Sequence, residues 1–248
     1  MKGNFVSRVP ALMMLASGIA ALLLRIMLYR TAVDVKGLLL RNSPLEIAVI
    51  VLTAAVLLGI ALIARKTENS CRYEDVCSAS LMAGIGHVAA GSGILVTVLT
   101  GTTMMGGYME MIWRILGMAA PVCLLAAGVA RVLGKRPFFL LYLVTCLFLA
   151  LHTVTRYQFW SGNPQMQDFL FSLLGLLALV FFAYSQAAWD ANSGNLRSTV
   201  GSGLAAVYLC TAELARSSAA ALYLGGILWV LAELCSMKRS AAHEEKEM

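Results

Sequence analysis

The chain has 248 residues, of which 60% are hydrophobic and 13% are charged. Soluble domains contain roughly 45–50% apolar and about 25% charged residues, so this chain lacks the polar surface that a water-soluble globule needs. The formal charge of +6 does not indicate a nucleic-acid-binding protein, because the Lys and Arg residues fall singly or in pairs at the ends of apolar runs. Composition therefore predicts an integral membrane protein.

Eight apolar segments, each about as long as a transmembrane helix, follow one another along the chain. They cover approximately Pro10–Tyr29, Leu45–Ala64, Ser78–Leu99, Met109–Val132, Phe138–Thr155, Pro164–Ala187, Ser198–Ala215 and Ala219–Ser236. The first segment resembles a secretory signal, but it continues through Arg25 without a small-residue cleavage site, so we expect an uncleaved helix. The seventh segment is the weakest, because it is short and contains Gly201 and Gly203.

These segments predict an all-α, polytopic transmembrane helical bundle of about eight helices, with seven as the alternative. We expect a single integral membrane domain over residues 1–237. A short charged tail over residues 238–248 would lie in the cytoplasm.

The positive charges indicate the orientation of this bundle, because an even number of passes puts both termini on one side. Lys2, Arg8, Arg65, Lys66, Arg72, Arg131, Lys135, Arg136, Arg197, Lys238, Arg239 and Lys246 lie on the side of the termini. Arg30, Lys36, Arg41, Arg156 and Arg216 lie on the other side, and Arg25 and Arg114 lie just inside helices near it. Cations concentrate on the cytoplasmic side, so we expect both termini in the cytoplasm.

His87 is the only ionisable residue near the middle of a predicted helix, and such residues are functional candidates because charge is costly in hydrocarbon. Its neighbours at three and four residues are Ala83, Gly84, Ala90 and Gly91, a face suited to close helix packing. One interpretation is a proton relay or ligand contact. The other, which we favour, is a neutral histidine that hydrogen-bonds a neighbouring helix.

The lack of a central Asp, Glu or Lys argues against an ion-coupled carrier, and the lack of a late lysine excludes a retinal protein.

Polar residues gather toward the predicted external side. The candidate ligand-binding residues there are Glu110, Arg114, His152, Arg156, Trp160, Gln165 and Asp168, and Arg25, Glu213 and Arg216 lie near the same side. Glu110 and Arg114 are four residues apart, as are His152 and Arg156, so each pair shares one helix face. These residues could form a water-facing pocket for a polar or anionic small molecule, anchored by Arg114 and Arg156. The blander alternative, to which we give more weight, is a ring of interfacial ion pairs with an aromatic belt.

No signature of catalysis or of cofactor binding is present in the sequence. The chain has no metalloprotease, serine-hydrolase or P-loop motif, and the glycines around His87 lie inside an apolar helix with no preceding strand. The six cysteines are expected to be plain thiols, and the methionines near Met109 to be packing residues rather than a copper site. We therefore expect no cofactor and no metal, and the assignment as an enzyme stays open, leaning to no.

Two stretches resemble uncharacterised multi-pass membrane proteins of clostridial bacteria: LLLRIMLYRTAVDVKGLL near the start, and TRYQFWSGNPQMQDFLFSLLGLLALVFFAYSQAAWD in the second half. Together they cover about a quarter of the chain. The resemblance implies a bacterial cytoplasmic membrane and supplies no activity and no functional residue.

The sequence thus favours a non-enzymatic membrane protein that acts through an external-facing polar pocket or through contacts with partner subunits. The alternative is a small-solute permease or a membrane subunit of a transporter. The expected partners are the lipid bilayer, other membrane subunits or a small polar or anionic ligand, and no nucleic acid.

Overall fold

The computed structural model of the protein describes residues 5–31, 43–67, 73–77, 79–101, 107–161, 169–215 and 219–237. Within these ranges the only regular elements are helices: α1 (Phe5–Thr31), α2 (Pro44–Lys66), α3 (Tyr73–Val76), α4 (Leu81–Thr100), α5 (Tyr108–Val132), α6 (Phe139–Trp160), α7 (Leu170–Asp190), α8 (Leu196–Glu213) and α9 (Ala220–Ser236). Each of the eight predicted apolar segments contains one long helix, so the prediction of an all-α bundle of about eight helices is confirmed.

Several boundaries differ from the sequence prediction, and one short helix was not predicted. Helix α1 begins at Phe5 and holds Pro10 inside it. Helix α6 runs to Trp160 instead of ending at Thr155, because no glycine or proline interrupts the chain until after Ser161. The short helix α3 was not predicted, because four residues are too few to show a periodic pattern. The expected start of the sixth segment at Pro164 lies outside the described residues.

Local capping explains where several helices begin. The Ser43 side chain accepts a hydrogen bond from the backbone N–H of Glu46, and the Ser80 side chain accepts one from Ala83. The Asn195 side chain accepts hydrogen bonds from the backbone N–H groups of Arg197 and Ser198. This cap fixes the start of α8, which the sequence marked as the weakest of the eight segments.

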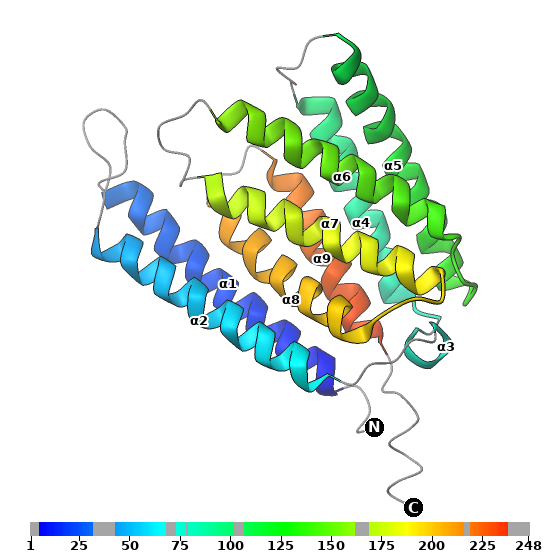
Figure 1. Ribbon diagram of the computed structural model, residues 1–248, viewed down its shortest axis with the longest axis horizontal. Coiled ribbons are helices and arrows are strands. Elements are labelled where there is room, and N and C mark those ends of the chain that lie inside the picture. Colours follow the sequence, from blue (N-terminus) through cyan, green and yellow to red (C-terminus); the bar gives the residue numbers. More distant parts are fainter. Residues whose placement is uncertain are drawn as a thin grey trace, which may run out of the picture.

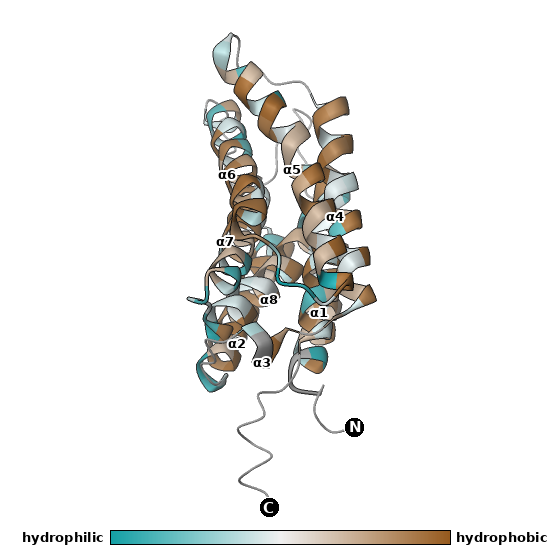
Figure 2. Ribbon diagram, turned by 90° about the vertical axis from the view of Figure 1, so that its right-hand side faces the viewer, coloured by the Kyte–Doolittle hydropathy of each residue, from teal (hydrophilic) through white to brown (hydrophobic). Residues whose placement is uncertain are grey.

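The long helices run up and down through the bundle in two layers (Figures 1 and 2). One layer contains α5, α4, α9 and α1 in that order, and the other contains α6, α7, α8 and α2. Helix α1 begins and α9 ends at the same end of the bundle (Figure 1). We call this end the terminal side and the opposite end the far side.

The outer surface of the bundle is apolar, as a membrane protein requires. Large side chains such as Leu58, Leu81 and Leu99 are exposed on it, and six helices (α1, α2, α4, α5, α6 and α7) are long and apolar enough to cross a membrane. Helices α8 and α9 have 18 and 17 residues, about 26 Å of helix each, and most of their side chains are buried. These two helices therefore occupy the interior, while α2 lies mostly exposed at the edge.

Helix α4 packs unusually closely against α9 because glycines line the contact. A Cβ atom added to Gly93 would lie 2.3 Å from the carbonyl oxygen of Ala221, and one added to Gly225 would lie 2.5 Å from that of Ala89. Only glycine permits such an approach between two helix backbones. The contact brings the neighbouring side chains of α4 and α9 against one another, and His87 and Glu233 are among them.

Candidate functional site

The most polar site in the described interior is an ion pair between Arg131 on α5 and Glu233 on α9. The Arg131 guanidinium donates from Nη2 to Glu233 Oε2 at 2.6 Å and from Nε to Oε1 at 3.3 Å. Glu233 is fully buried and Arg131 is 2% exposed. This two-point geometry is the strongest form of an arginine–carboxylate contact. It connects two helices that are far apart in the sequence.

His87 of α4 lies beside this ion pair and is itself fully buried. Its Nδ1 atom is 2.7 Å from the carbonyl oxygen of Ala83 and 3.6 Å from Glu233 Oε1. Its Nε2 atom is 2.7 Å from the hydroxyl of Tyr142 on α6. We call His87, Arg131, Tyr142 and Glu233 the terminal-side cluster. It joins α4, α5, α6 and α9.

Two aromatic residues and a thiol enclose the terminal-side cluster. Trp229 of α9 stacks on Tyr142 with a ring separation of 6.2 Å, and lies 5.7 Å from the His87 ring. On the terminal side, Arg131 Nη1 donates to the hydroxyl of Tyr73 in α3 at 3.0 Å. Burial raises the pKa of Tyr73 to about 12, so this hydroxyl stays neutral and accepts the arginine hydrogen bond. Burial likewise raises the pKa of Cys77 to about 12.

A second buried ion pair lies near the opposite end of the bundle. Arg25 of α1 donates from Nη1 to Glu213 Oε2 of α8 at 2.9 Å and to the carbonyl oxygen of Ala212 at 2.7 Å. Its Nη2 atom donates to the Tyr29 hydroxyl at 3.0 Å, and its guanidinium lies 4.4 Å from the Phe171 ring centre. We call Arg25 and Glu213 the far-side pair. The sequence placed both residues near this side without pairing them.

The predicted external residues occupy the far side, each with a local contact. Arg114 donates to Glu110 Oε1 at 2.8 Å and 3.0 Å along one exposed helix face, as their spacing of four predicted. The His152 ring is buried, and its Nδ1 accepts a hydrogen bond from Trp113 Nε1 at 3.2 Å.

The remaining predicted residues divide between α6 and the chain beyond it. Arg156 lies 5.7 Å from the Trp160 ring centre, and Trp160 stacks on Phe169 at 4.3 Å. The predicted fifth segment ended at Thr155, whereas Arg156 and Trp160 both belong to the last turns of α6. Gln165 and Asp168 lie outside the described residues. Whether Arg114 and Arg156 bind a ligand stays a prediction.

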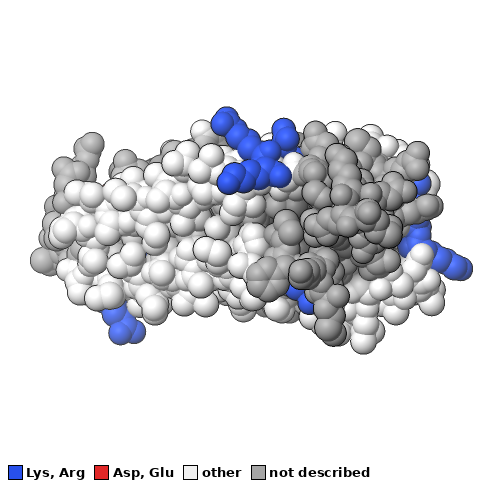
Figure 3. All heavy atoms as spheres, turned by 90° about the horizontal axis from the view of Figure 1, so that it is seen from below, with Lys and Arg blue, Asp and Glu red and all other residues white. Residues whose placement is uncertain are grey.

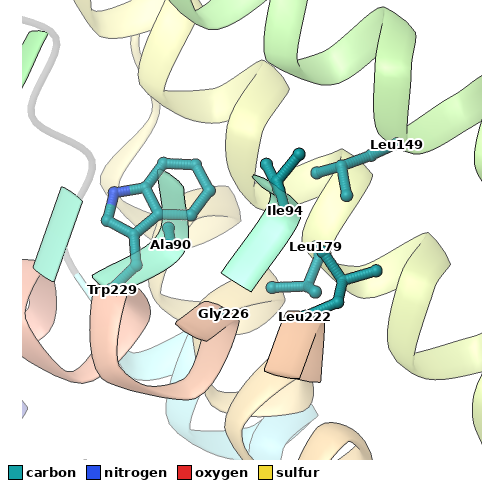
Figure 4. Close-up of a pocket in the computed structure, with 7 residues that line it drawn as sticks. All are labelled: Ala90, Ile94, Leu149, Leu179, Leu222, Gly226 and Trp229. Carbon is teal, nitrogen blue, oxygen red and sulfur yellow. The ribbon is translucent and has the colours of Figure 1, made fainter. Parts of the chain in front are cut away.

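A small apolar cavity lies between the layers, lined by side chains of α4, α6, α7 and α9 (Figure 4). Its volume is about 10 Å³, roughly the space that one water molecule needs. Ala90, one turn along α4 from His87, and Trp229 both contribute to its wall. The cavity therefore adjoins the terminal-side cluster, and its volume is too small for a solute.

The described residues contain no group of three or more His, Cys, Asp or Glu side chains that could hold a metal ion. Comparison of the chain with protein-family models, with curated proteins and with solved structures gave no match. The assignment of function therefore rests on the geometry of the site.

Sequence reasoning selected His87 but not its charged partners. The favoured interpretation, a histidine that hydrogen-bonds a neighbouring helix, agrees with its contact to Tyr142. Arg131 was treated as a cation that marks the membrane surface, whereas the structure buries it against Glu233. One signal could have found Glu233: it is the single charged residue in the last apolar segment.

Proposed function

We propose that this chain is a small-solute permease or the membrane subunit of a transporter, and that the terminal-side cluster controls passage through it. The observation that carries the proposal is the full burial of an Arg–Glu ion pair and a histidine between four helices of a membrane bundle. Ionisable groups within membrane helices are characteristic of solute and ion pathways.

Energetic considerations support a functional role for this cluster. Removing two charges from water costs several kcal/mol each, and apolar residues of similar volume often stabilise a protein as well as a buried ion pair does. Packing alone therefore gives little reason for Arg131 and Glu233. A permease, in contrast, needs a contact between α5 and α9 that can break and re-form, and this ion pair provides such a contact.

The two buried ion pairs lie where the two gates of a permease would be expected. The terminal-side cluster joins α4, α5, α6 and α9, and the far-side pair joins α1 and α8. The apolar cavity of about 10 Å³ lies in the core of the same bundle. This arrangement fits an occluded conformation, in which both sides are closed and opening requires one ion pair to separate.

We further propose that the protein lies in a bacterial cytoplasmic membrane with both termini in the cytoplasm. Seen from below, the described surface shows Lys and Arg but no Asp or Glu side chains, and part of this surface is the terminal side (Figure 3). The ends of α2 and the turn before α6 contribute Arg65, Lys66, Lys135 and Arg136 to this side. The positive-inside bias supports the orientation, and the clostridial resemblance supports the bacterial membrane.

Cysteine accessibility tests the permease proposal directly. In a variant whose six native cysteines are replaced by serine, Ala90→Cys places a single thiol on the cavity wall. We expect a small membrane-impermeant thiol reagent to label it in membrane vesicles as the protein visits open conformations. Weakening the terminal-side link with Glu233→Gln should increase the labelling rate at least about tenfold, because loss of the carboxylate charge shifts the equilibrium toward opening.

Two control positions calibrate this experiment. Leu133→Cys lies in the exposed turn after α5 and should label rapidly, while Ala206→Cys on the buried interior of α8 should not label. If Ala90→Cys fails to label from either side, in both the parent and the Glu233→Gln variant, the permease proposal is wrong.

A second candidate function is ligand binding by an external polar pocket. The observation that favours it is the buried Nε2 atom of His152, which has no hydrogen-bond partner within the described part of the chain. A thermal-shift screen with small anions tests this candidate. We expect stabilisation of the parent that is lost in Arg156→Ala, and equal stabilisation of both proteins would contradict the pocket.

A further inference from the structure

We propose that His87 and Glu233 form a proton-exchange pair, and that the proton is the coupling ion of the permease. This inference rests on the proposed function and assigns its ion. The sequence argued against an ion-coupled carrier, because no acidic residue lies near the middle of a predicted helix. The structure changes that argument by placing Glu233 Oε1 3.6 Å from His87 Nδ1 inside the bundle.

The contacts of His87 define which of its nitrogens carries the proton. Nδ1 lies 2.7 Å from the Ala83 carbonyl oxygen, which can only accept a hydrogen bond, so Nδ1 must be the protonated nitrogen. In the neutral ring Nε2 is then an acceptor, and the Tyr142 hydroxyl at 2.7 Å donates to it. The resting cluster is thus a neutral histidine beside a Glu233 carboxylate that pairs with Arg131.

Proton uptake by this arrangement follows a balanced sequence. A proton adds to the lone pair of Nε2 and produces an imidazolium, and the Tyr142 hydroxyl rotates from donating to accepting. The Nδ1 proton then transfers to Glu233 Oε1, which leaves a neutral ring protonated at Nε2 and a neutral carboxylic acid. One proton has been taken up and no other group is consumed.

This transfer also explains how a proton would open the bundle. Protonated Glu233 no longer forms an ion pair with Arg131, so the link between α5 and α9 weakens. Loss of the proton restores the carboxylate and the pair. Protonation is therefore tied to the contact proposed to close the terminal side.

Other titratable groups surround the pair and belong to the same electrostatic unit. The groups that interact with the pair are Arg131 from α5, Tyr142 from α6, Asp190 at the end of α7 and Cys77 after α3. Tyr73 from α3 and Arg136 before α6 interact with Arg131 or Asp190 in turn. Asp190 is 6% exposed, and its Oδ2 atom has no hydrogen-bond partner among the described residues.

Nitrogen-15 NMR of the lipid-reconstituted protein tests the inference, because the chain contains only three histidines. His152→Gln and a variant that replaces the histidine of the C-terminal tail assign the His87 signals. At neutral pH we expect His87 to be protonated at Nδ1 only. Acidification should protonate Nε2, which gives an imidazolium or, once the Nδ1 proton has moved to Glu233, a ring protonated at Nε2 alone. Tyr142→Phe should change the Nε2 signal more than the Nδ1 signal.

The matched pair Glu233→Gln and Glu213→Gln makes the test specific. Both remove a buried carboxylate that pairs with an arginine, but only Glu233 lies beside His87. We expect Glu233→Gln to move the midpoint of His87 protonation to lower pH by about one unit or more, because it removes the carboxylate that stabilises the imidazolium. Glu213→Gln should leave the midpoint unchanged.

Three results would overturn the proton-exchange proposal: a ring protonated at Nε2 instead of Nδ1 at neutral pH, no protonation of Nε2 between pH 9 and 4, or equal midpoints in the two glutamine variants. Such a result combined with labelling of Ala90→Cys would leave a permease that protons do not drive. Normal exchange without labelling of Ala90→Cys would overturn the permease instead.

Discussion

Arg131 and Glu233 are charged side chains that neither water nor lipid headgroups reach in this conformation. Each compensates the charge of the other, and Tyr73 and His87 add contacts on either side. Removing one member leaves a buried charge without its counter-ion, whereas removing both leaves no buried charge that needs a counter-ion. Comparing single with double substitutions of this pair therefore separates its effect on stability from its effect on function.

The single substitution Arg131→Met should reduce the free energy of unfolding by about 3–5 kcal/mol, because Glu233 is left buried and unpaired. The double substitution with Glu233→Met should recover most of that loss. Unfolding in mixed detergent micelles measures both values. A double variant as unstable as Arg131→Met would show that the pair is not the source of the effect.

Cys77 offers a pH-dependent measurement outside the membrane-spanning helices. Burial raises the pKa of its thiol from 9.0 to about 12, so its thiolate fraction at pH 8 is about a thousandfold smaller than that of an ordinary thiol. With the other five cysteines replaced by serine, we expect slow alkylation by iodoacetamide that still accelerates above pH 9. The unfolded chain is the control, and a native rate that levels off near pH 9 would contradict the assignment.

At the scale of elements, α4 organises the terminal-side cluster because it packs closely on both neighbours. Its glycines meet α9 through Gly86 and Gly93, and α5 through Gly84 and Gly91. The small-residue face that the sequence predicted around His87 is thus confirmed for α5. The second face, toward α9, follows from the positions of Gly86 and Gly93.

Gly93→Ala should destabilise the protein by about 1–3 kcal/mol, because the new Cβ would overlap the Ala221 carbonyl oxygen at 2.3 Å. Gly59→Ala in α2 is the matched control, since no atom lies within 4 Å of the added Cβ. That substitution should be neutral or stabilise the protein by about 0.5–1 kcal/mol. Thermal unfolding in detergent compares the two, and equal effects would argue against the close α4–α9 contact.

At the scale of the whole molecule, the alternation of eight long helices places the start of α1 and the end of α9 on one side (Figure 1). A seven-pass chain would separate them. The seventh predicted segment is helical, because α8 spans Leu196–Glu213 and is buried on most of its surface.

Reporter fusions test this topology in cells. A fluorescent protein fused after Gly134 or after the last residue should fluoresce in the cytoplasm, and alkaline phosphatase fused after Gly107 should be active outside. These positions follow from the ends of α5 and from the charge bias. Phosphatase activity from the C-terminal fusion would favour seven passes, and the reverse pattern at all positions would invert the orientation.

Much of the helical arrangement is predictable, whereas only part of the site is. Apolar segments indicate helices because lipid requires every backbone hydrogen bond to form within a segment. The pair Glu110–Arg114 was also predictable, because residues four apart in a helix lie on the same face. The contacts of His87 were not, because Tyr142 and Glu233 are 55 and 146 residues away along the chain.

The sequence by itself determined that this protein is a helical membrane bundle, since solvent preference and helix length are local properties. Only the tertiary structure decided that the few charges near the helix ends meet in buried pairs. A charged side chain near a helix end can face lipid, water or a counter-ion on another helix, and the packing of the helices decides which of these it meets. The close approach of α4 and α9 made that selection for Glu233, and the contact with α5 made it for Arg131.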